Sequence, residues 1–119
     1  WEDGQMTGLG LLEEYVSTWA VAISDDGLII GNSSEPFVWD TEHGIRSLAQ
    51  FLMDSIELDL SGWSDLFVTD ISSDGKTIIG IGYNLVLDDF QGFIITIPEP
   101  TSILLIGIGA VVLRKRKSD

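Results

Sequence analysis

The chain has 119 residues, which is enough for one small domain. It carries 19 acidic residues against six basic ones, for a formal net charge of −13, and it contains no cysteine. An acidic chain repels phosphate backbones, so we expect no nucleic-acid partner. The lack of cysteine excludes disulfides, thiolate metal sites and a cysteine nucleophile.

Charge is divided unevenly along the chain. Positions 1–99 hold 18 acidic residues and only two basic ones, so this region has a formal charge of −16. The other four basic residues are consecutive, at 114–117. This asymmetry separates an acidic body, residues 1–97, from a tail, residues 98–119. Such a body could attract cations or keep an exported protein soluble.

The body is expected to be mainly β, because glycine turns separate short runs of β-branched and aromatic residues. The clearest run is Ala20–Ile23, then Ser24-Asp25-Asp26-Gly27, then Leu28–Gly31. Asp-Gly between two apolar runs predicts a hairpin, since glycine accepts the positive φ of a tight turn. The pattern recurs at Ile71–Gly80, 48 residues further on and with one residue inserted. We therefore expect positive φ at Gly27 and Gly75.

A second unit recurs beside these hairpins. Trp1–Leu9 resembles Trp39–Leu48, and a third copy starts at Gly92–Ile95. Periods of this size are typical of propeller blades or β-arrays. The predicted fold is a set of antiparallel propeller-like repeats, about two blades, followed by a C-terminal transmembrane helix. Because a propeller needs roughly 4–8 blades, we expect the chain to be the C-terminal part of a longer protein.

One helix is predicted within the body, around residues 46–57. Apolar residues at the i, i+3, i+4 spacing of one buried helix face are Ile45, Leu48, Ala49, Leu52, Met53 and Ile56. The opposite side carries Arg46, Gln50, Asp54 and Glu57. The alternative is a connection with chance periodicity.

The acidic turn at Asp70–Gly75 is a candidate calcium loop. It has oxygen-bearing side chains at positions 1, 3 and 5 and glycine at position 6. Position 12 is Ile81, where a glutamate would be required, and the first hairpin has Ala22 in place of Asp70. A plain hairpin turn is therefore favoured, and neither a metal nor a cofactor is expected.

Catalytic candidates are scarce. His43 is the only histidine, and it lies beside Glu42 in a predicted surface turn with no nucleophile near it. No pair of carboxylates is singled out by spacing, so glycosidase chemistry is not indicated. The tryptophans, which are Trp1, Trp19, Trp39 and Trp63, are interpreted as core residues in preference to a sugar-binding platform.

The tail combines three parts in order. Pro98-Glu99-Pro100 precedes an apolar stretch, residues 101–113, and Arg114-Lys115-Arg116-Lys117 follows directly. An apolar helix that ends in basic residues predicts a membrane anchor with its cations on the cytoplasmic side. Thirteen residues span only about 20 Å, against about 30 Å of hydrocarbon, so snorkelling and local thinning of the bilayer are needed. The alternative is a buried or interfacial segment of a soluble protein.

These three parts resemble the PEP-CTERM sorting domain of Gram-negative bacteria. The resemblance implies that an exosortase, a membrane cysteine peptidase, processes the chain near Pro98-Glu99-Pro100, with Arg114–Lys117 as the membrane stop. Hosts with such signals are typically biofilm or exopolysaccharide producers. Residues 1–10 and the two Ile-Ser-Asp-Gly hairpins resemble the extracellular repeats called HAF repeats.

The sequence thus predicts a non-enzymatic exported protein, with an inner-membrane intermediate and a final place at the cell surface or outside the cell. The expected partners are the membrane and an exosortase, and an exopolysaccharide is a candidate third. The alternative is the C-terminal part of a propeller enzyme or of a carbohydrate-binding lectin.

Overall fold

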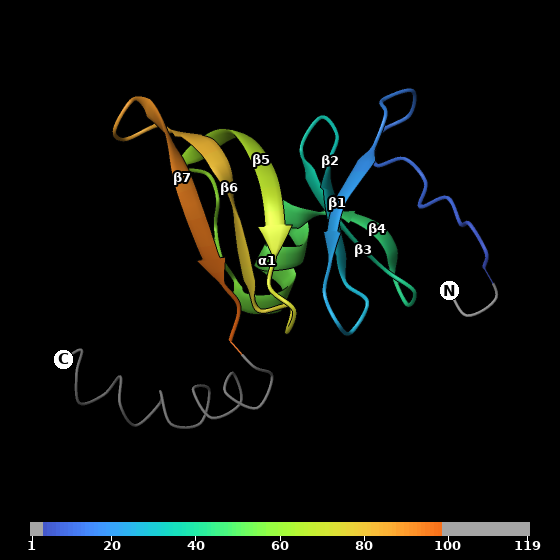
Figure 1. Cartoon of the computed structure of the whole chain (residues 1–119). Coiled ribbons are helices and arrows are strands. Elements are labelled where there is room, and N and C mark those ends of the chain that lie inside the picture. Colours follow the sequence, from blue (N-terminus) through green and yellow to red (C-terminus); the bar gives the residue numbers. More distant parts are fainter. Residues whose placement is uncertain (1–3, 99–119) are drawn as a thin grey trace.

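The computed structural model describes residues 4–98 as two antiparallel sheets and one helix (Figure 1). The elements in chain order are β1 (Trp19–Ile23), β2 (Ile29–Asn32), β3 (Pro36–Asp40), β4 (Gly44–Ser47), α1 (Leu48–Ile56), β5 (Trp63–Ile71), β6 (Thr77–Asn84) and β7 (Asp89–Thr96). The first sheet has the order β1-β2-β3-β4 and the second β5-β6-β7. The expected mainly-β, antiparallel fold is confirmed, and the described strands form no closed barrel.

Both predicted hairpins are present. Gly27 has a φ of 92° between β1 and β2, and Gly75 has a φ of 75° between β5 and β6. The two turns are also built alike, since Ser24 Oγ accepts from the Leu28 N–H at 3.1 Å and Ser72 Oγ from the Thr77 N–H at 3.0 Å. The prediction of positive φ at both glycines is confirmed.

The recurrence extends beyond the turns to the strand register. Three cross-strand pairs of the first sheet each have an equivalent in the second. Trp19–Asn32 corresponds to Phe67–Ile81, Ala20–Gly31 to Val68–Gly80, and Ala22–Ile30 to Asp70–Ile79. Both sheets therefore carry a bulge at the same place in their first strand. A phenylalanine of the third strand also lies close to the same glycine, Phe37 at Gly31 and Phe93 at Gly80. The two hairpins and their third strands are structurally equivalent units.

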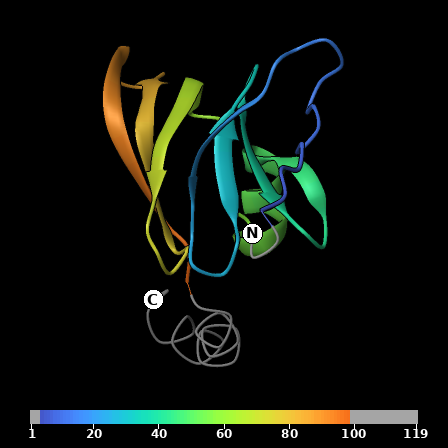
Figure 2. The ribbon, with the colours of Figure 1, turned by 45° about the vertical axis from the view of Figure 1, so that its right-hand side comes forward.

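The two sheets lie face to face (Figures 1 and 2). The two faces in contact occupy different positions in the repeated unit. One side of the first sheet, which we call its front face, presents Ile30 and Val38. These meet the inner face of the second sheet, formed by Ile71, Ile78 and Ile95. β5 lies against β1, β2 and β3, and all five apolar side chains are buried in one core. Burial of these side chains on both sheets is the main source of stability.

Helix α1 completes the core beside β3 and β4. It begins after Ser47, whose Oγ accepts from the Gln50 N–H at 2.9 Å, and it ends at Glu57, where φ is 55°. Leu48 and Leu52 are buried as predicted, whereas Ala49 and Met53 are exposed. The prediction that the helix covers 46–57 was wrong at its start. Arg46 lies in β4, because strand pairing with Val38 holds it there.

Two other expectations concern the ends of the chain. Residues 4–18 form no helix or strand, so the predicted likeness of Trp1–Leu9 to Trp39–Leu48 has no counterpart in the described residues. The predicted helix 101–113 lies outside them. Between residues 4 and 98, no helix has the length and apolar character needed to span a membrane.

Candidate sorting segment and neighbouring surface features

The acidic body and the tail meet at the end of β7. Ile97 follows this strand directly, is 7% exposed and donates its N–H to the Lys76 carbonyl at 2.7 Å. Pro98 comes next and is half-buried. Proline has no N–H to donate, so it suits the point at which strand pairing stops. The first residue of the predicted motif is therefore joined to the core without a spacer.

The remaining predicted sorting residues lie outside the described part of the chain. These are Glu99, Pro100 and the membrane-stop residues Arg114, Lys115, Arg116 and Lys117. Ile97 precedes a proline, which disfavours helical backbone in the residue before it, and Ile97 is not helical. The structure thus places the beginning of the motif but not its far end.

The candidate calcium loop uses its acidic groups within its own turn. One oxygen of Asp74 accepts from Ser72 Oγ at 2.6 Å and from the Lys76 N–H at 2.9 Å. These hydrogen bonds, the one from Ser72 first, lower the pKa of Asp74. Asp26 likewise accepts from Ser24 Oγ in the first hairpin. Across residues 4–98, no group of three or more potential ligands is assembled to hold a metal.

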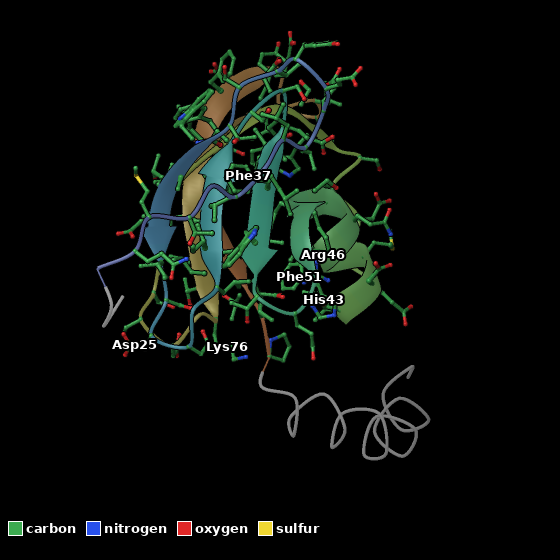
Figure 3. All side chains as sticks on the ribbon, turned by 90° about the vertical axis from the view of Figure 1, so that its right-hand side faces the viewer. Asp25, Phe37, His43, Arg46, Phe51 and Lys76 are labelled. Carbon is green, nitrogen blue, oxygen red and sulfur yellow. The ribbon has the colours of Figure 1, made fainter. Side chains whose placement is uncertain are left out.

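The two hairpin turns contact each other at one end of the molecule. The Asp25 N–H donates to the Ser73 carbonyl at 2.7 Å. A Cβ placed on Gly75 would lie 3.3 Å from both the Asp26 carboxylate and Ser24 Oγ. Figure 3 labels Asp25 of one turn and Lys76 of the other at this same end of the molecule. The Asp-Gly turns therefore join the two sheets as well as reversing the chain.

His43 lies in a turn with two charged neighbours (Figure 3). Its Nδ1 is 3.0 Å from an oxygen of Asp40, whose second oxygen accepts from Arg46 at 2.9 Å. Partial burial raises the pKa of Asp40, but hydrogen bonds from His43 and the positive charge of Arg46 outweigh this, so the pKa is lowered. The Arg46 guanidinium also lies 5.0 Å from the centre of the Phe51 ring. These contacts attach the β3–β4 turn to α1.

A groove of about 400 Å³ lies beside α1 and the start of β5. It combines the Trp63 ring with three carboxylates and several hydroxyls and apolar groups. The residues that line it are Ser34, Glu35, Pro36, Leu48, Ala49, Met53, Leu58, Asp59, Leu60, Ser61, Trp63, Ser64, Asp65 and Leu66. The sequence did not indicate this groove, since its residues come from three separate segments.

The tryptophans take intermediate positions. Trp39 and Trp63 are half-buried, and Trp63 meets the Phe93 ring edge-on with centroids 5.9 Å apart. Trp19 is 47% exposed and lies 6.0 Å from the ring of Phe67. Trp1 lies outside the described residues. The described tryptophans therefore border the core rather than filling it.

The tail matches a known family. Residues 96–117 match the family model described as the PEP-CTERM protein-sorting motif. The match begins at the last residue of β7 and includes the Pro-Glu-Pro motif and the basic cluster, so the predicted sorting motif is confirmed. This motif implies export across the membrane to the cell surface and processing by an exosortase. Among curated proteins and solved structures, none matches this chain.

Proposed function

We propose that this chain is a non-enzymatic exported protein of a Gram-negative bacterium, which displays acidic β-repeats at the cell surface or in the extracellular matrix. The observation that carries this function is the sorting-motif match at residues 96–117, which begins where the last strand ends. The signal is thus a tail on a folded body. Processing near Pro98-Glu99-Pro100 would leave the sheets intact.

The charge pattern supports an orientation in the membrane. The basic residues at 114–117 follow the apolar stretch directly, and cations at the end of a membrane helix stay on the cytoplasmic side. A helix at 101–113 would satisfy its own backbone polar groups in hydrocarbon. The acidic body, residues 1–97, holds 17 acidic and two basic residues, for a formal charge of −15, and it then lies on the opposite side. We propose this arrangement for the inner-membrane intermediate that meets the exosortase.

The described body supports a binding or structural role rather than catalysis. The only histidine of the sequence has both ring nitrogens beside carboxylates, Nδ1 at 3.0 Å from Asp40 and Nε2 at 3.4 Å from Glu42, so among the described residues neither nitrogen is hydrogen-bonded to a hydroxyl nucleophile. The equivalent hairpin units support the propeller-like interpretation, in which each unit is one antiparallel sheet of an extracellular repeat of the HAF type. An exopolysaccharide would be the natural partner of such repeats outside the cell.

The test is to produce the chain behind an export signal in a host that has an exosortase. The wild type is compared with Glu99→Ala and with a variant in which residues 114–117 are serine, while Glu57→Ala, on the body, is the control. We expect both tail variants to remain unprocessed in the membrane fraction and the control to be processed normally. Normal processing and surface display of both tail variants would refute the sorting function.

The groove beside α1 favours a second candidate function, which is binding of a saccharide. An indole face and several carboxylates are the groups that contact sugar rings and their hydroxyls in protein sites. Trp63, Glu35 and Asp65 bring these groups together here. Titration with the host's exopolysaccharide would be compared for wild type, Glu35→Gln/Asp65→Asn and the control Asp88→Asn/Asp89→Asn. Loss of binding only in the groove variant is expected, and equal binding by all three would exclude this site.

A further inference from the structure

One face of the second sheet is apolar, and none of the described residues, 4–98, covers it. Its outer face, which lies opposite the inner face, carries Phe67, Ile79, Ile81 and Ile94. Their exposed fractions are 42%, 43%, 44% and 68%. Isolated exposed apolar residues are ordinary on protein surfaces, but a contiguous group on one sheet face indicates a contact surface.

The internal repeat shows what covers such a face. By strand register, Ile79 and Ile94 of the second sheet are equivalent to Ile30 and Val38 of the first. Ile30 and Val38 are 0% exposed, because the inner face of the second sheet lies on them. The same pair of positions is therefore buried in one unit and open in the other. A surface that binds the outer face should therefore be apolar, like the inner face of the second sheet.

The chain itself presents a second surface of that kind. The back face of the first sheet contains Ile23, Ile29 and Trp39, which are equivalent to the inner-face residues Ile71, Ile78 and Ile95. Ile23 is 47% exposed, and Ile29 and Trp39 are half-buried. The segment before β1 approaches this face at β4, where Gly10 meets the side chain of Ile45. Within the part of the chain that the structure describes, the β1–β2 side of the back face is left partly exposed.

We propose that the outer face of the second sheet binds the back face of the first sheet in a second copy of this chain. The contact repeats between molecules the stacking that joins the two sheets within one molecule. Because it pairs two different surfaces, it is a head-to-tail interface, which continues into rings or filaments unless it is capped. Apolar burial on both faces stabilises the assembly. This inference concerns only the folded body and is independent of sorting.

Cysteine cross-linking tests the proposal directly, since the chain has no cysteine of its own. Ile94→Cys and Ile23→Cys full-length chains carry different epitope tags and are co-expressed in cells without an exosortase. The cells are lysed and treated immediately with a short bismaleimide cross-linker. We expect a covalent dimer that carries both tags. We expect neither variant to form a dimer when expressed alone, and we expect a chain with both cysteines to give a ladder of higher species.

Control variants separate this interface from other contacts. Ile79→Lys in the double-cysteine chain should abolish the ladder, because a lysine would be desolvated at the interface. Leu87→Lys, at an exposed site between β6 and β7, should leave it unchanged. A dimer formed by Ile94→Cys alone would show face-to-face pairing and overturn the head-to-tail arrangement. A mixed dimer no more abundant than that of the helix-surface pair Asp54→Cys and Ile23→Cys would overturn the interface altogether. Neither result bears on processing of the tail.

Discussion

The side-chain amide of Asn32 pairs with both backbone polar groups of Val68. Its nitrogen donates to the Val68 carbonyl at 2.9 Å and its oxygen accepts from the Val68 N–H at 2.8 Å. Asn32 ends β2, and Val68 lies in β5, at the edge of the other sheet. The amide thus occupies the place of a neighbouring strand, and both residues are buried.

We expect Asn32→Ala to destabilise the body by about 2–4 kcal/mol, because it leaves a buried N–H and a buried carbonyl without partners. Urea unfolding followed by tryptophan fluorescence measures this change. The control is Asn84→Ala, which removes amide hydrogen bonds to Gln91 and to the Val86 and Leu87 N–H groups, all within the second sheet and its β6–β7 turn, while leaving the two sheets joined. A loss for Asn32→Ala no larger than that of the control would contradict the proposed role of the amide.

The glycines of the two hairpin turns should differ in their tolerance of alanine. Gly27→Ala is expected to cost about 1–2 kcal/mol, because a side chain disfavours positive φ. Gly75→Ala should cost about 1 kcal/mol more, since its Cβ would crowd Ser24 and Asp26 in the adjoining turn. Thermal unfolding of the two variants measures the difference. Equal losses would mean that the turn–turn contact adjusts freely.

The stability contributed by Asp40 should depend on pH. Its folded-state pKa lies below the unfolded value of about 3.9, so the contribution is complete above about pH 4 and is lost as pH falls through the folded-state pKa. We expect Asp40→Asn to cost about 1–2 kcal/mol at pH 7 and less at pH 2.5. Urea midpoints at both values measure this, with Asp54→Asn as control. An equal loss of stability at both pH values would show that the contribution of Asp40 does not depend on its ionisation.

The Asp70–Gly75 turn should not bind calcium tightly. Asp74 already accepts hydrogen bonds from Ser72 and Lys76, and the twelfth position of the loop pattern is Ile81. Calorimetric titration of the wild-type chain with calcium should therefore show no micromolar site. The prediction fails if such a site appears in the wild type and disappears in Asp74→Ala.

Access to the sorting motif should be limited by the folded body. Ile97 is held in the core and by Lys76, only one residue before Pro98. A flexible Gly-Ser spacer inserted between Ile97 and Pro98 should speed processing several-fold, because the peptidase then reaches an extended segment without meeting the sheet. Pulse–chase labelling measures the rate. The same spacer placed between Val86 and Leu87 is the control, and equal rates for both insertions would show that the body does not limit access.

Sequence patterns predicted the local elements but not their assembly. The Asp-Gly turns were predictable because glycine at positive φ is a local requirement, and Leu48 and Leu52 were predictable from helical spacing. The start of α1 was not, because pairing of Arg46 with Val38 in the sheet overrides its place in the helical pattern. The pairing of Asn32 with Val68 joins residues from different units, and an asparagine at a strand end was the only signal for it.

The candidate functional features likewise include one that the sequence predicts and others that only the packing reveals. The sorting motif is a linear pattern, so its residues could be read directly from the sequence and the family match confirms it. The groove around Trp63 and the outer face of the second sheet arise from the packing of separate strands. Alternation along β6 and β7 shows that one face is apolar, but which face is covered depends on how the sheets stack.

The junction at Ile97 also determines how the body responds to mechanical load. The chain leaves β7 at its end, and β7 forms eight paired positions with β6. Interstrand hydrogen bonds run perpendicular to the strands, so a pull along β7 shears all of them together instead of opening them one after another. A body tethered through this strand would therefore resist a pull along β7 as a unit.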